Sequence, residues 1–247
     1  MNHIHNLWNN DNDSIEFALN WFASIVQHPM KLNEIMQLLY SIQGVGKDTL
    51  FDYIGNKILG KKYYFNTDKT ELLFGRFNSC IENKILVIMN ETSGKDTYQI
   101  NENIKCAITA ENNTIEHKGM KQYKNTNHIE YVFLTNNENP IKVPQGDRRF
   151  CGIECNNNIC NDKEYFDALR SEIDSGTIDR AFFNYMMSID VDNYDFTNNR
   201  PITQFYNDMK EMNTPPMALF LESVVMNNNT DIIHKEQASI LFRQYSV

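Results

Sequence analysis

The sequence lacks the features that mark membrane, secreted and disulfide-rich proteins. Among its 247 residues, no apolar run approaches the roughly 20 residues needed to cross a bilayer. The first eight residues contain His and Asn where a secretory signal has a basic start and an apolar stretch. The five cysteines form an odd set without a CxxC pair, which argues against a disulfide framework and a standard zinc site. We therefore expect free thiols, no membrane contact and a location inside a cell.

Basic residues are also scarce. Lys and Arg number 23 against 32 Asp and Glu, and the formal net charge is -9. A negative protein is not drawn to nucleic acid as a whole, so any DNA contact must be local. The apolar content of 41% is that of an ordinary globular protein. From the change of pattern along the chain we expect a helical lead-in over residues 1–30, a core over 31–155 and a helical region over 156–247.

Three short apolar runs indicate an α/β fold with a central parallel sheet. They cover residues 35–42, 85–89 and 131–135. Runs this short and this apolar are typical of parallel strands that are covered on both faces. The second run ends in Asn90 and Glu91, and the third ends in Asn136 and Asn137. Because parallel strands end at one edge of a sheet, these polar residues are expected at the edge where α/β proteins bind ligands.

The remaining patterns predict helices and one hairpin. Ser14 can cap a helix that runs to about residue 28, and Gly60 can close a helix that follows the first strand. A helix is expected over residues 103–110. The polar segment 114–127, with Gly119 in its middle, predicts a β-hairpin.

A glycine loop lies between the first predicted strand and the helix that follows it. Phosphate loops need small residues, so that backbone N–H groups can converge on phosphate oxygens, and a lysine for charge. The usual signature is G-x-x-x-x-G-K-[ST], but Ser41 occupies the place of the first glycine and Asp48 the place of the hydroxyl. We predict that this loop binds ATP through Gln43, Gly44, Val45, Gly46, Lys47, Asp48 and Thr49.

Glu91 is placed to polarise the attacking water or to help hold magnesium, although it could also be an acid at the start of a helix. An Asp often precedes this Glu, but here the residue is Asn90, which we add to the nucleotide-binding set. One carboxylate could have moved to Asp48. The candidate Mg²⁺ ligands are therefore Asp48, Thr49 and Glu91.

The order of motifs resembles that of superfamily 3 helicases, and most of all the helicase domains of primase-polymerase/helicase proteins in phages and large DNA viruses. The resemblance covers roughly residues 14–155. The segments that carry it are residues 21–27, 44–49, 76–78, 85–91, 116–119, 133–140 and 147–150.

This resemblance implies an AAA+-like P-loop core with an inserted β-hairpin and a helical C-terminal appendage. It implies a homo-hexameric ring that hydrolyses ATP between subunits and pulls one strand of single-stranded or forked DNA through its centre. A primase-polymerase domain could lie on the parent chain. By position, Lys47 would hold phosphates, Glu91 would act on water, Asn136 or Asn137 would orient that water, and Arg148 or Arg149 would reach a neighbour's nucleotide.

The hairpin would face the ring's channel, so Lys118, Lys121 and Tyr123 are the candidate DNA contacts. The lysines could instead be a solvated face, and Tyr123 could pack at the hairpin root. The arginine pair could be part of a solvated loop.

Two other functions are open. The first is a nucleotide- and DNA-binding ring or scaffold with weak or no hydrolysis, because Asp48 and Asn90 break the magnesium pattern. The second is a P-loop enzyme such as a nucleotide kinase, which would need a lid rich in Arg.

Overall fold

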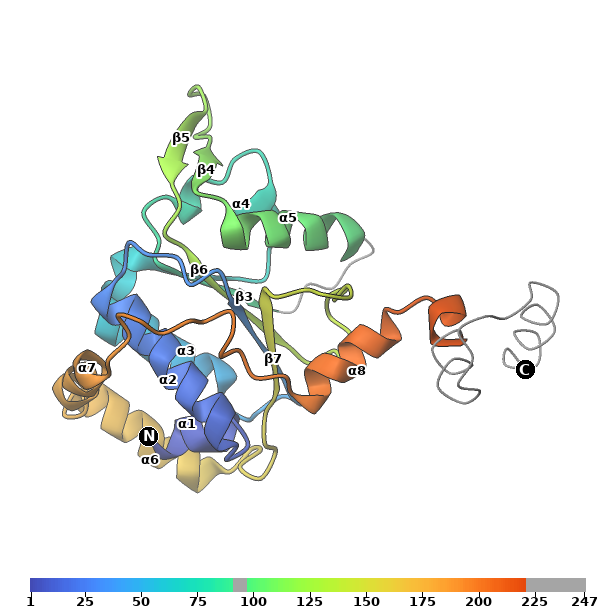
Figure 1. The fold of residues 1–247 in the computed structure, drawn as a ribbon. Coiled ribbons are helices and arrows are strands. Elements are labelled where there is room, and N and C mark those ends of the chain that lie inside the picture. The colour runs from blue at the N-terminus through green and yellow to red at the C-terminus, as the bar shows by residue number, and fades with distance from the viewer. Residues whose placement is uncertain (91–96, 221–247) are drawn as a thin grey trace.

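The protein is a three-layer α/β structure, described by a computed structural model over residues 1–90 and 97–220 (Figure 1). A five-stranded parallel sheet has the order β2-β3-β6-β1-β7. Its strands are β1 (Met36–Tyr40), β2 (Tyr64–Thr67), β3 (Leu86–Asn90), β6 (Glu130–Thr135) and β7 (Phe150–Glu154). The predicted α/β fold with a parallel sheet is confirmed, and the apolar runs expected near residues 36, 86 and 131 form its three central strands.

The strands alternate their side chains between two hydrophobic cores, as the period of two in a β-strand requires. In β3, Leu86 and Ile88 enter the first core, whereas Val87 and Met89 enter the second. Both faces are covered, which explains why the runs are continuously apolar. β2 was not predicted, because its four residues include Asn66 and Thr67 and show no apolar run.

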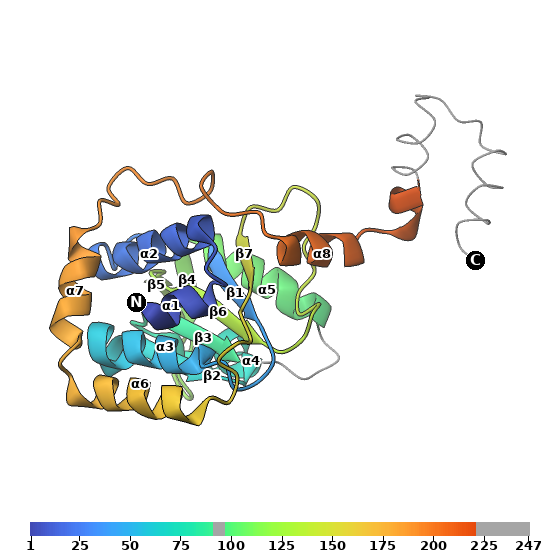
Figure 2. The ribbon, with the colours of Figure 1, turned by 90° about the horizontal axis from the view of Figure 1, so that it is seen from below.

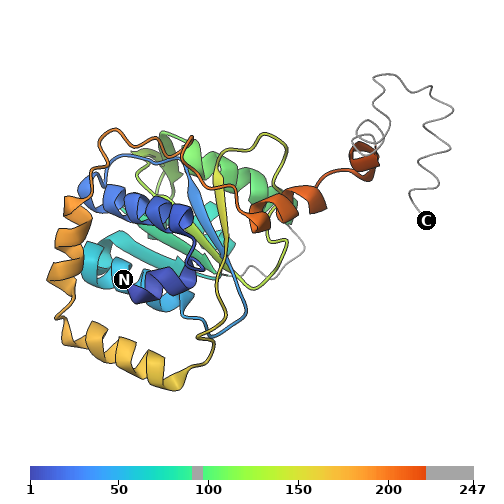
Figure 3. The same cartoon turned by 60° about the horizontal axis from the view of Figure 1, so that its bottom comes forward.

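Helices from both ends of the chain cover the first face of the sheet. They are α1 (Asn2–Leu7), α2 (Asn12–Gln27), α3 (Lys47–Tyr53), α6 (Lys163–Ser175) and α7 (Asp179–Ser188), which Figures 2 and 3 show together on one side. Trp8, Trp21 and Phe51 are fully buried in this core. The three-part domain division stays a prediction. In the structure, residues of both flanking regions share a core with the sheet.

The second face is covered by α4 (Thr70–Phe74), α5 (Thr97–Thr109) and α8 (Gln204–Met212). Phe205, Tyr206 and Met209 of α8 are buried there. Gly152 of β7 permits this close approach, because a Cβ at this position would lie 2.8 Å from the Met209 methyl carbon.

Two helix boundaries differ from the prediction. Asp11, rather than Ser14, caps α2: its carboxylate accepts a 3.1 Å hydrogen bond from the Ser14 backbone N–H. Asp and Ser both suit this role. With Asp11 as the cap, the helix is longer by most of a turn than it would be with Ser14. The helix expected from residue 103 begins at Thr97. After α3 the chain continues as a π-helix (Ile54–Gly60). As predicted, this helix ends at Gly60, which has φ +94°.

The predicted hairpin is present as β4 (Asn112–Ile115) and β5 (Tyr123–Thr126), which pair antiparallel. It projects from the body of the molecule (Figure 1). Asn78 holds the end of β4, because the Asn78 side chain donates to the Thr114 carbonyl (2.9 Å) and accepts from the Glu116 N–H (3.1 Å). Among the described residues, no helix is long and apolar enough to cross a membrane.

Candidate nucleotide site

The loop between β1 and α3 has the backbone of a phosphate-binding loop. Gly44 and Gly46 have φ values of +91° and +86°, a left-handed conformation that disfavours every residue with a Cβ. A Cβ on Gly44 would overlap Asn161, and one on Gly46 would overlap Phe166 and His3. Both glycines are therefore required, by conformation and by the segments packed against the loop.

Lys47 joins this loop to the neighbouring strand. Its ammonium donates to the Ser41 carbonyl (3.2 Å) and hydroxyl (2.6 Å), and to the Thr135 carbonyl (2.9 Å). It also contacts the Asn136 side-chain oxygen at 3.1 Å. The residue is buried. These oxygen acceptors hold the positive charge of Lys47 beside the loop.

These residues line a cavity of about 210 Å³ at the carboxyl edge of the sheet. Asn90 at the end of β3 and Asn136 directly after β6 line it, and the loop supplies residues 42–48. Asn137 does not line this cavity: its backbone N–H donates to the Thr135 hydroxyl, and its side-chain oxygen accepts from the Asn139 N–H, both at 3.0 Å. Glu91 lies outside the described residues.

A polar cluster that the sequence did not reveal adjoins the cavity. The Asn90 amide nitrogen donates to the Asn66 oxygen at 2.7 Å, and the Asn66 amide nitrogen lies 3.4 Å from an Asp52 oxygen. Desolvation and the Asp52 carboxylate raise the pKa of Asp48, while Lys47 and a hydrogen bond from Asn66 oppose the rise. Asp48 lines the cavity beside this cluster, and together with Thr49 it also lines a second cavity beside α6.

The outer side of the loop is held by α1 and by the start of α6. The His3 ring lies 3.0 Å from the Gly46 carbonyl through Nε2 and 3.1 Å from the Tyr165 hydroxyl through Nδ1. Burial lowers the pKa of His3. The Asn161 N–H donates to the Gly44 carbonyl at 3.0 Å. The loop is thus braced by regions that sequence patterns treat as flanking.

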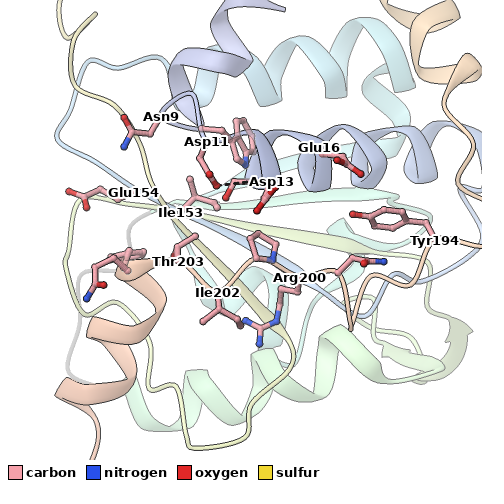
Figure 4. A pocket seen from close by; sticks show the side chains of 16 residues that line it. Asn9, Asp11, Asp13, Glu16, Ile153, Glu154, Tyr194, Arg200, Ile202 and Thr203 are labelled. Atoms are coloured by element: carbon pink, nitrogen blue, oxygen red, sulfur yellow. Dashed lines mark hydrogen bonds between the residues drawn. The ribbon is translucent and has the colours of Figure 1, made fainter.

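A larger cavity, of about 660 Å³, lies between the start of α2, the end of β7 and residues 199–205 (Figure 4). Asp11, Asp13 and Glu16 line it from the helix side, and Glu154 lines it from the strand. The lining also includes Arg200, whose guanidinium donates to the Phe150 and Asp147 carbonyls, so the four carboxylates outnumber it and repel phosphate. Size alone therefore does not make this cavity the nucleotide site.

The two arginines differ in their surroundings. Arg149 pairs with the buried Asp147 carboxylate at 3.2 Å, and its N–H also donates to that side chain at 2.8 Å. Arg148 is exposed and makes none of the ion pairs found in the described part of the chain. The Arg149 carbonyl accepts from the Met36 N–H at 2.8 Å, so both arginines lie at the amino edge of the sheet.

The three candidate DNA residues on the hairpin also differ in their surroundings. Lys118 and Lys121 are exposed near the tip, which turns at Gly119 with φ +83°. Tyr123 opposes Ile115 in the last strand pair before the hairpin loop, where its ring stacks on His117 and its hydroxyl donates to Glu82. Tyr123 therefore packs beside the hairpin loop, and its contact with DNA stays a prediction.

Comparisons with known proteins agree with this arrangement. Residues 39–149, from β1 to Arg149, match the model of a family of unknown function, DUF5906. The chain is 29% identical over 190 residues to the DNA primase-polymerase of Nitratiruptor phage NrS-1. That alignment covers 76% of this chain and 26% of the phage protein.

Two solved apo structures of the NrS-1 C-terminal region match the fold, with TM-scores of 0.76 and 0.75 at 23% identity. Each match covers 99% of this chain and 61% of that structure. The predicted resemblance to a phage primase-polymerase protein is confirmed, and the fold is shared with that protein's C-terminal region. The chain spans about a quarter of the phage protein's length.

Proposed function

We propose that this chain is the ATP-hydrolysing motor of a phage or viral DNA helicase. In this proposal, ATP with Mg²⁺ binds at the loop around Lys47, subunits form a hexameric ring, and the ring translocates on single-stranded or forked DNA. A primase-polymerase domain elsewhere on the parent protein would fit the similarity to the NrS-1 protein, of which this chain spans 26%.

The observation that carries the proposal is the position of the Lys47 ammonium. It lies where the carboxyl ends of β1 and β6 meet, next to Asn136 and within a glycine loop. A lysine there can bind the β- and γ-phosphates, and an amide on the adjacent strand end can orient a water molecule beside them. Glu91, which directly follows β3, is proposed as the residue that accepts a proton from this water.

The arrangement favours hydrolysis between subunits. The arginine pair lies beside Met36 at the start of β1, whereas the loop begins after its end at Tyr40. Five strand residues separate these edges by on the order of 15 Å, so Arg148 is too distant for its own loop. A neighbour in a ring can offer its loop instead, and we propose Arg148 as the trans-acting arginine. Arg149 would hold Asp147 and the loop that presents Arg148.

The hairpin is the proposed DNA contact. Lys118 and Lys121 would face the ring's channel, where six copies concentrate positive charge despite the acidic chain. Tyr123 is proposed to support the hairpin through Glu82 and His117, because its ring face and hydroxyl already have partners.

The test is phosphate release by the purified protein, measured with and without single-stranded DNA over a range of protein concentrations. We expect DNA to stimulate release and the specific rate to rise with concentration, because each active site needs two subunits. ATP binding without turnover, in rings that still bind DNA, would favour the alternative of a scaffold with weak or no hydrolysis. That alternative is open because Asp48 and Asn90 break the magnesium pattern. A protein that binds no nucleotide would overturn the proposal.

A further inference from the structure

Asn66 links the two residues that depart from the usual magnesium pattern. It lies at the carboxyl end of β2, and its backbone is in register with Ile88 of β3. Its oxygen accepts from Asn90 at 2.7 Å, and its amide nitrogen lies on the side of Asp48 and Asp52. Three neighbouring strands thus carry an asparagine at or next to their carboxyl ends: Asn66 in β2, Asn90 in β3 and Asn136 directly after β6.

The chemistry of an amide suits this link. Between a carboxylate and a second amide, one side chain must donate on one side and accept on the other, and Asn does both. Asn90 presents its nitrogen to Asn66, so its oxygen is the atom that it can offer to a cation. Asp48 offers carboxylate oxygens. Mg²⁺ prefers such oxygen ligands and keeps several of its waters, so Asp48 and Asn90 fit a magnesium–ATP complex at the adjoining cavity.

We propose that Asn66 is a positioning residue for magnesium. It holds Asp48 and Asn90 in the arrangement from which they bind the ion or its water shell. This inference rests on the proposed function and deepens it. In the usual motif a hydroxyl and an Asp hold magnesium, and here we assign that role to the unit of Asp48, Asn66 and Asn90. Tyr64 supports Asn66 indirectly. Its hydroxyl donates to Asp52 at 2.7 Å, and the same Asp52 oxygen lies 3.4 Å from the Asn66 amide nitrogen.

The first experiment measures metal affinity directly, without turnover. Mn²⁺ binding to the protein with a non-hydrolysable ATP analogue is followed by electron paramagnetic resonance, for the parent and for Asn66→Ala. Loss of a residue that orients metal ligands costs about 10- to 100-fold in metal affinity, and we expect a loss in this range. Analogue affinity in the absence of divalent metal should stay within about twofold, because Asn66 does not line the phosphate cavity.

The chain offers a matched control. Asn113 donates to Asn127 at 2.7 Å near the hairpin root, so Asn113→Ala removes an Asn–Asn hydrogen bond of the same length at a distant place. This variant should keep the parent's Mn²⁺ affinity. If Asn66→Ala does not fold, Asn66→Ser replaces it, and the same direction of change is required.

A second measurement separates positioning from simple stabilisation. If Asn66 acts through Asp48, the effect of Asn66→Ala on Mn²⁺ affinity should shrink in an Asp48→Ala background, as coupled residues do. Equal Mn²⁺ affinity in the parent and the Asn66 variant, with nucleotide bound in both, would overturn this inference and leave the proposed function intact. A parent protein that binds no nucleotide would overturn both.

Discussion

The two edges of the sheet carry different kinds of functional residue. At the carboxyl edge, the polar groups are bound to one another: Lys47 contacts Ser41, Thr135 and Asn136, and Asn90 contacts Asn66. At the amino edge and on the hairpin, Arg148 and Lys118 extend into solvent. A preorganised network can hold a small ligand within one subunit, whereas exposed cations act on something outside it. Under the proposed function, the carboxyl edge would bind the nucleotide, and the amino edge and hairpin would reach a neighbour or DNA.

Lys47→Ala is the sharpest test of the carboxyl edge. We expect ATP turnover to fall below detection, because the phosphates lose their only cation among the residues that line the described cavity. The Ser41 and Thr135 carbonyls also lose a donor, so a modest fall in melting temperature is expected. Turnover and thermal unfolding are measured together. Turnover close to the parent's would remove the phosphate-loop assignment.

Arg148→Ala tests whether the amino edge acts on a neighbour. An arginine finger contributes about 10³ to 10⁵ in rate, so this variant should lose at least 10³-fold in turnover with an unchanged melting temperature. Mixing it with Lys47→Ala should restore partial activity, because an intact loop on one chain meets an intact arginine on the other. No recovery, with both variants still assembling together, would exclude a trans-acting Arg148.

Arg149→Ala is the matched comparison for Arg148→Ala. Its removal leaves the buried Asp147 carboxylate without its ion-pair partner, so we expect about 1–3 kcal/mol of lost stability. Chemical denaturation of the two variants measures the difference. If Arg148→Ala is the less stable of the two, the roles that we assign to this pair are reversed.

Lys118 and Lys121 test the hairpin. Each lost phosphate contact removes roughly 0.7 from the slope of log affinity against log salt for single strands, so the double Ala variant should lose about 1.4. The control is Lys57 with Lys61, two exposed lysines outside the hairpin, whose double Ala variant changes the net charge equally. DNA binding at several salt concentrations measures both slopes. Equal slopes for the two variants would place the DNA contact elsewhere.

Glu130 tests the stability of the sheet that lies between these two edges. This residue begins β6, accepts from the Asn33 N–H at 2.5 Å and is buried, and burial raises its pKa to about 8. Between the ordinary value of 4.5 and about 8, the unfolded chain loses this proton while the folded chain keeps it. Stability should therefore fall as pH rises through this window, by at most about 1.4 kcal/mol per pH unit from this group.

Glu130→Gln keeps the shape and removes the charge, so its free energy of unfolding should fall less steeply over the same window. Urea denaturation from pH 5 to pH 8 measures both slopes. A variant as steep as the parent would show that Glu130 ionises freely in the folded protein.

The sequence alone determined the features that depend on neighbouring residues. Continuous apolar runs require a sheet covered on both faces, and Gly44 and Gly46 before Lys47 require a loop that turns at a strand end. The hairpin followed from a polar segment around Gly119. In each case the decisive residues lie within one turn or one strand, so the physical cause can be read locally.

Only the tertiary structure decided which distant residues meet. Asn66 could not be found from its own segment, because its role comes from strand order, which places β2 beside β3. The difference between Arg148 and Arg149 depends on Asp147, whose carboxylate is buried beneath a loop that Arg200 and Tyr206 hold. Burial and strand order arise from packing over the whole chain, and no pattern of adjacent residues records them.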